Sequence, residues 1–90
     1  MSAKYQVFLH PKAAKELDGL KPEIREKVKS ALKGLSVNPT KGIPLNPSRF
    51  RRIIVGNYRV IYDTDDAKNK VIVLFIGHRK NVYDSFNRLF

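Results

Sequence analysis

The chain opens with alternating apolar and polar side chains, which predict a first strand over residues 4–10. The apolar face of this strand consists of Tyr5, Val7 and Leu9. Pro11 ends the alternation and favours the first turn of a helix, and Gly19 marks where that helix ends. We therefore expect a short helix to follow the first strand.

A longer apolar stripe at helical spacing predicts a second helix that begins at Pro22. The stripe consists of Ile24, Val28, Ala31, Leu32 and Leu35. Because the connection between the two helices is short, we expect an antiparallel helical hairpin. Residues 36–48 contain three prolines and a glycine, so we interpret them as a loop.

β-branched and aromatic residues dominate the next part of the chain and predict three further strands. These strands are expected at residues 50–55, 58–64 and 71–76. Gly56 and Asn57 form the sequence of a two-residue hairpin turn, and polar residues separate the second strand from the third. An antiparallel three-stranded meander is the expected result.

The predicted order of strand, two helices, three strands and tail is that of an α+β fold. Ninety residues suffice for one hydrophobic core, so we expect a single domain over residues 1–90. Both helices are expected on one face of the sheet, which leaves the other face for function. Residues 78–90 are predicted to close the sheet edge as a short helix or an ordered coil.

Charge narrows the classes of partner. The chain has 18 Lys and Arg residues against 8 Asp and Glu, and its formal net charge of +10 attracts nucleic acid, an acidic protein or an anionic membrane. Between Glu26 and Asp63 there is no acidic residue, so positive charge is concentrated there. We call this interval the basic segment; it carries Lys27, Lys29, Lys33, Lys41, Arg49, Arg51, Arg52 and Arg59.

Several functional classes are excluded by composition. Without cysteine and with only two histidines, the chain has no thiolate zinc site, and its carboxylates are too scattered for a two-metal nuclease. No glycine-rich phosphate loop is present, so we expect neither metal nor cofactor. Because no apolar run resembles a signal peptide or a membrane span, we expect a cytoplasmic protein with no membrane partner.

Strand parity places two arginines on the free face of the predicted sheet. A turn at Gly56-Asn57 pairs Ile54 with Arg59 and Arg52 with Ile61, and paired residues share a face. Arg52 and Arg59 then lie on a diagonal with their stems about 7–8 Å apart, close enough for both guanidinium groups to contact one phosphodiester. Arginines on an open sheet face are also ordinary solvated residues, so both interpretations stay open.

Other candidate RNA contacts surround this pair, namely Arg49, Arg51, His78, Arg79 and Lys80. Simple alternation sends Arg51 to the opposite face unless a bulge intervenes. His78 is interpreted as a supporting residue, although a general base or a phosphate contact is also compatible with its position. Tyr83 is either a core residue or a ring on which a base stacks.

Two segments of the chain are distinctive, namely residues 52–62 (RIIVGNYRVIY) and residues 73–83 (VLFIGHRKNVY). Both resemble segments of toxins of the RelE/ParE superfamily, and of the RelE type in particular. The first half agrees in its opening strand and paired helices. The resemblance implies a toxin that enters the ribosomal A site and cleaves messenger RNA without a metal, through attack of the ribose 2′-hydroxyl on the adjacent phosphate.

The same resemblance implies roles for four residues. Arg52 is expected near the scissile phosphate, and Arg59 is expected to stabilise its developing charge. Arg79 is expected to assist the leaving oxygen, and Tyr83 is expected to stack on a base. Such a reaction needs alignment and charge stabilisation, which fixed guanidinium groups provide. Many relatives carry a second basic residue where this chain has Ile54, so the identity of the general base stays open.

Two other functions stay open beside the nuclease. One is a ParE-like, non-enzymatic inhibitor of DNA gyrase, and the other is an inactive homologue that only binds its antitoxin. Fold does not separate them, but the joint presence of Arg52, Arg59, Arg79 and Tyr83 favours the nuclease. The expected partners are the ribosome, messenger RNA and a cognate antitoxin whose acidic, amphipathic helical segment neutralises the basic segment.

Overall fold

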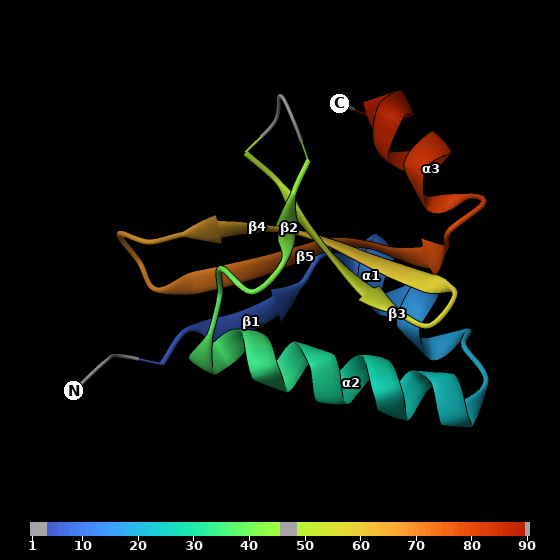
Figure 1. Ribbon diagram of the computed structural model, residues 1–90, viewed down its shortest axis with the longest axis horizontal. Helices are drawn as coiled ribbons and strands as arrows, with labels where there is room; N and C mark the ends of the chain where they lie inside the picture. Colours follow the sequence, from blue (N-terminus) through green and yellow to red (C-terminus); the bar gives the residue numbers. More distant parts are fainter. Residues whose placement is uncertain (1–3, 46–48, 90) are drawn as a thin grey trace.

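The computed structural model describes residues 4–45 and 49–89 of the chain (Figure 1). Residues 46–48 of the predicted loop and Phe90 of the predicted tail lie outside this part. The elements follow the order β1 (Gln6–Leu9), α1 (Pro11–Asp18), α2 (Pro22–Val37), β2 (Ile43–Pro44), β3 (Arg51–Val55), β4 (Tyr58–Asp65), β5 (Lys70–His78) and α3 (Val82–Leu89). In this described part, no helix combines the length and the apolar character needed to cross a membrane.

The sheet is mixed and has five strands, in the order β1-β5-β4-β3-β2. The α+β class is confirmed, but the predicted sheet, a first strand and a three-stranded meander, has one strand fewer than the structure. The meander strands are present as β3, β4 and β5, and β1 joins them by parallel pairing with β5. β2 lies inside the predicted loop, where Pro44 masks the strand signal because proline is compatible only with a sheet edge.

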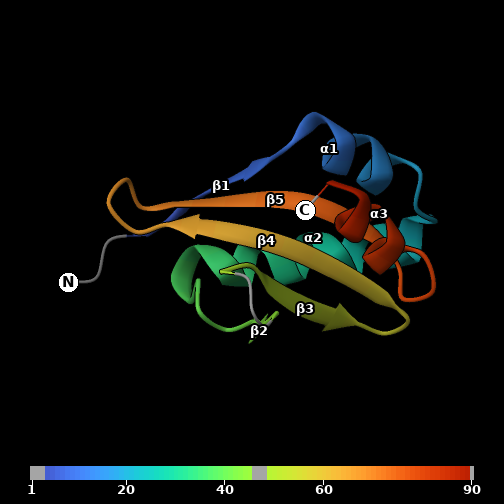
Figure 2. The same cartoon turned by 90° about the horizontal axis from the view of Figure 1, so that it is seen from above.

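Helices cover both faces of the sheet, because the tail forms a third helix on the face that was expected to be free (Figures 1 and 2). On one face α2 packs Val28, Leu32 and Leu35 into the larger core cluster. On the opposite face α3 contributes Val82 and Phe86 to a smaller cluster. The tail forms a helix because its apolar residues recur at helical spacing, so it has one side to bury.

α1 packs mainly against β5, and its buried residues Ala13 and Leu17 belong to the same core cluster as the buried residues of α2. β5 is longer than β1, so the backbone of its second half has no strand on that side. The Glu16 carboxylate of α1 accepts a hydrogen bond from the backbone N–H of Ile76 at 3.0 Å. α1 therefore covers the edge of β5 that β1 leaves open.

Candidate functional site

The β3–β4 hairpin has the register that the turn sequence predicts. Ile54 pairs with Arg59 and Arg52 pairs with Ile61, and Gly56 adopts the positive φ of 58° that the turn requires. Arg52, Ile54 and Arg59 therefore share the sheet face that α3 partly covers, here called the α3 face. The parity argument is confirmed, and the face that was expected to be open is instead half occupied by a helix.

A hollow of about 360 Å³ lies on the α3 face between the β2 loop and α3. Its lining residues are Leu45, Arg52, Tyr83, Phe86 and Asn87. Nη1 of Arg52 donates a hydrogen bond to the Tyr83 hydroxyl at 3.2 Å, and Cζ of Arg52 lies 5.9 Å from the centre of the Tyr83 ring. The structure thus brings together two of the four predicted catalytic residues.

The Arg52 guanidinium is not fully satisfied by the protein. Its Nε is buried and has no hydrogen-bond partner among the described residues. A buried donor without an acceptor costs free energy, and an anionic oxygen is the strongest acceptor for a guanidinium. Because Arg52 gives the lining of the hollow a positive charge, the hollow is suited to an anionic group next to an aromatic ring.

Arg59 and Arg79 lie at the β3–β4 turn, away from the residues that line the hollow. Nη1 of Arg59 donates to the carbonyl oxygens of Gly56 at 3.1 Å and Tyr58 at 3.0 Å. The backbone N–H of Arg79 donates to the Asn57 carbonyl at 2.8 Å, and its side chain is exposed. The guanidinium groups of Arg52 and Arg59 have different partners, so the structure does not bring them together on one point.

Three of the other predicted RNA contacts are engaged by the protein. Arg49 forms an ion pair with Asp63 at 2.8 Å, which sequence proximity alone does not reveal. Arg51 is not aimed at the hollow: it lies on the opposite face and donates to the Gly42 carbonyl at 2.9 Å. His78 pairs with Tyr58 on that same opposite face, and its Nδ1 accepts from the Lys80 backbone N–H at 3.2 Å.

The Lys80 side chain is exposed just beyond β5, next in sequence to Arg79. It therefore belongs to the cations at the β3–β4 turn end and not to the hollow. Within residues 4–45 and 49–89, no group of three or more histidine, aspartate or glutamate side chains is arranged to hold a metal ion.

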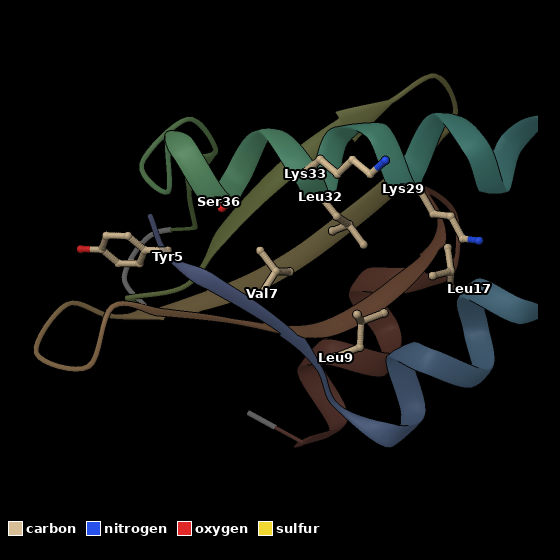
Figure 3. Close-up of a pocket in the computed structure, with 8 residues that line it drawn as sticks. All are labelled: Tyr5, Val7, Leu9, Leu17, Lys29, Leu32, Lys33 and Ser36. Atoms are coloured by element: carbon tan, nitrogen blue, oxygen red, sulfur yellow. The ribbon is translucent and has the colours of Figure 1, made fainter. Parts of the chain in front are cut away.

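An apolar groove of about 460 Å³ runs between β1 and α2 (Figure 3). Tyr5, Val7, Leu9, Leu17, Lys29, Leu32, Lys33 and Ser36 line it. Figure 3 shows side chains from β1 and α2 pointing into the space between these two elements, with both lysines along the α2 border. The sequence predicted the apolar stripes of β1 and α2 as core residues only. In the structure β1 and α2 leave a groove between them, and part of both stripes lines it.

Comparison with known proteins identifies the family. A family model described as the ParE toxin of type II toxin–antitoxin systems matches residues 7–83. This chain belongs to the RelE/ParE superfamily of type II toxins. No curated protein sequence matches this toxin.

Solved structures of related toxins resemble this toxin over most of its length. The toxin in the RelBE2 toxin–antitoxin complex from Mycobacterium tuberculosis shares 29% identity, with a TM-score of 0.79 over 90% of this chain and 98% of that chain. The isolated RelE toxin from E. coli shares 25% identity, with a TM-score of 0.74 over 96% and 99% of the two chains. An archaeal RelE–RelB complex from Pyrococcus horikoshii, at 23% identity, has the same fold with a TM-score of 0.75 over 88% and 99%.

The candidate site also contains residues that the sequence pattern does not indicate. Leu45 and Asn87 line the hollow, and neither residue type carries a signal for such a role. The buried Tyr62 hydroxyl holds the loop before β2, and burial raises the pKa of this hydroxyl above its usual value of 10.0. Tyr62 therefore stays protonated and acts as both donor and acceptor at neutral pH.

Proposed function

We propose that this toxin is a metal-independent endoribonuclease that cuts messenger RNA in the ribosomal A site. The contact between Arg52 and Tyr83 in the hollow supports this proposal most strongly. It places a guanidinium beside a ring that can stack on a base.

In the proposed reaction the ribose 2′-oxygen forms a bond to phosphorus while the bond to the leaving 5′-oxygen breaks. The 2′-hydroxyl loses its proton and the leaving oxygen gains one. Arg52 would hold the phosphate and Tyr83 would stack on the neighbouring base, so the attacking and leaving oxygens are aligned. Negative charge that develops on the phosphate is stabilised by fixed guanidinium groups.

Arg59 needs to change partners to take part. Its two hydrogen bonds to the Gly56 and Tyr58 carbonyls join a cation to neutral acceptors at a partly exposed position. A phosphate oxygen carries negative charge, so it attracts the guanidinium more strongly than the neutral carbonyl oxygens do. RNA would therefore draw Arg59 from the turn, and Arg79 would approach the leaving oxygen from the same end of the sheet.

No base is assigned for the 2′-hydroxyl proton. The lining residues of the hollow include neither a carboxylate nor an imidazole, and Ile54 occupies the position of the second basic residue of many relatives. We propose that the toxin accelerates cleavage mainly through alignment and charge stabilisation. A modest cleavage rate is the consequence.

Gyrase inhibition is the second candidate, because the matching family model is described as a ParE toxin. One experiment separates the two functions. The purified toxin is added to a reconstituted translation system with a defined messenger RNA, and in parallel to a gyrase supercoiling reaction. Cuts within A-site codons, mapped by primer extension, support the nuclease. Intact RNA with blocked supercoiling supports the gyrase inhibitor and refutes the nuclease.

We also propose that the groove between β1 and α2 receives an amphipathic segment of a cognate antitoxin. Solved relatives include toxin–antitoxin complexes. The apolar floor suits the apolar side of such a segment, and Lys29 and Lys33 at its border suit acidic residues on the polar side. Part of the basic segment would be neutralised in this complex.

A further inference from the structure

The loop between α2 and β3 is fastened to the sheet by two side chains that point away from the hollow. Tyr62 is fully buried in the larger core cluster. Its hydroxyl donates a hydrogen bond to the Pro39 carbonyl at 2.8 Å and accepts one from the Gly42 N–H at 2.9 Å. Arg51 adds hydrogen bonds from Nη1 to the carbonyls of Gly42 at 2.9 Å and Thr40 at 3.3 Å.

Gly42 is where the loop comes closest to the sheet. A Cβ atom at this position would lie 2.5 Å from the Tyr62 hydroxyl oxygen and 2.7 Å from the Arg52 carbonyl oxygen. Only glycine permits such an approach, and both the N–H and the carbonyl of Gly42 are used by the two fastening side chains. The loop is therefore held at Gly42 by hydrogen bonds and by close packing against the sheet.

This fixed point is connected to the hollow through a few residues. Directly after Gly42, β2 pairs with β3, where Ile43 lies opposite Arg52. The backbone N–H of Leu45 then donates to the Phe50 carbonyl at 2.9 Å, and Leu45 forms one wall of the hollow. The chain thus passes around the β3 edge from the α2 face to the α3 face (Figure 1).

We infer that Tyr62 and Arg51 are positioning residues, which set the wall of the hollow and the strand position of Arg52 from the far side of the sheet. This inference rests on the proposed function for its effect on cleavage. Neither side chain lines the hollow, so neither is expected to touch RNA. Their loss should slow cleavage by ribosome-bound toxin and leave ribosome binding, which depends on exposed cations, nearly unchanged.

The test uses the Tyr62→Phe variant of the full-length toxin, which removes only the hydroxyl. Tyr58→Phe is the matched control, because Tyr58 lies on the same strand and face but packs against His78.

Tyr62→Phe should accelerate amide exchange at Gly42 and at Leu45 at least about tenfold, because two linked hydrogen bonds are lost or loosened. Single-turnover cleavage at saturating ribosomes should fall on the order of tenfold to a hundredfold, the effect of a small misplacement of a catalytic group. The half-saturating ribosome concentration should stay within about twofold.

Arg51 provides a second variant pair. Arg51→Ala removes the donors to the loop, whereas Arg51→Lys keeps one donor, so Lys should restore part of the cleavage rate that Ala loses. Cleavage by Tyr62→Phe at the rate of Tyr58→Phe, despite faster Gly42 exchange, would overturn the inference. If wild-type toxin does not cleave RNA, the proposed function fails separately. The amide exchange rate of Leu45 then tests whether Tyr62 positions the wall of the hollow. An unchanged exchange rate at Leu45 in Tyr62→Phe refutes that positioning role.

Discussion

Two adjacent arginines show how strand alternation assigns chemistry at the scale of single residues. Arg52 faces α3 and donates to Tyr83 in the hollow, whereas Arg51 faces the other way and donates to loop carbonyls. Both carry the same charge and stand next to one another in the basic segment. Composition does not distinguish the two arginines. Because successive side chains of a strand point to opposite faces, Arg52 lies in the candidate site and Arg51 holds the loop on the other face.

Arg59→Ala is expected to abolish most of the nuclease activity and to leave the fold intact. The cleavage rate should fall at least about a hundredfold, which corresponds to losing roughly 3 kcal/mol of transition-state stabilisation. Stability should fall by only about 1 kcal/mol, because the two lost hydrogen bonds lie at a turn near solvent. Single-turnover cleavage and thermal melts measure the two effects.

Lys27→Ala is the charge-matched control for Arg59→Ala, since Lys27 is exposed on α2. Its cleavage rate should stay close to that of the wild type. If Arg59→Ala unfolds at room temperature, the arginine serves the fold and its assignment to phosphate is wrong.

Ile54→Lys is expected to increase cleavage. Ile54 is 49% exposed and lies opposite Arg59 on the α3 face, so a lysine adds positive charge without opening the core. A new ammonium that contributes about 1.4 kcal/mol to the transition state raises the rate about tenfold. Val37→Lys, at a 72% exposed position on α2, adds the same charge far from the hollow and should change nothing. A slower Ile54→Lys toxin with unchanged melting temperature would contradict this expectation.

At the scale of elements, periodicity in the sequence predicts what local patterns encode. The alternating strands, the helical stripe of α2 and the turn at Gly56-Asn57 are all local patterns, and the structure contains each of them. β2 and the docking of α3 depend on contacts between distant segments. Phe86 of α3 packs edge-to-face on Phe50 at 5.5 Å and on Phe75 at 6.1 Å, and no local spacing predicts that meeting.

The candidate site was predictable to the same extent. The shared face of Arg52 and Arg59 follows from strand pairing alone. The hollow does not, because it requires α3 to bring Tyr83 to Arg52. The sequence also does not reveal that Arg49 pairs with Asp63 or that Arg51 donates to the Gly42 carbonyl, because these groups meet only in the folded sheet.

Gly42→Ala is expected to destabilise the toxin through the loop before β2. The new methyl group would overlap Tyr62 and the Arg52 backbone, and overpacking of this kind costs roughly 1–3 kcal/mol. Gly19→Ala is the control, since its nearest neighbours would lie at 3.6 and 3.7 Å. Urea unfolding should show lower stability for Gly42→Ala alone. Equal stability of the two variants would mean that the loop can move aside without cost.

At the scale of the whole molecule, the net charge of +10 would serve two kinds of partner under the proposed function. Exposed cations at the β3–β4 turn suit RNA, whereas Lys29 and Lys33 border the groove on the far side of the sheet. An acidic antitoxin can therefore bind the groove and lower the positive potential over the whole surface. Inhibition would then combine occupation of the groove with a weaker attraction for the ribosome.

Antitoxin binding is expected to weaken as salt concentration rises. Titration calorimetry with the cognate antitoxin at low and high salt measures this directly, because salt screens charge pairs near the surface. Replacing both Lys29 and Lys33 by glutamine should reduce the salt dependence more than the same change at Lys15 and Lys21, two exposed lysines outside the groove. Equal affinity at both salt concentrations would show that charge does not direct this complex.

The most direct test of the proposed nuclease is the rate at which ribosomes carrying a defined A-site codon lose intact messenger RNA after the toxin is added. Wild-type toxin and Lys27→Ala should cut within that codon at similar rates. Arg52→Ala should cut at least about a hundredfold more slowly, because the phosphate loses a preorganised guanidinium. Wild-type toxin that leaves the codon intact, or Arg52→Ala that cuts as fast as Lys27→Ala, would contradict the proposed site.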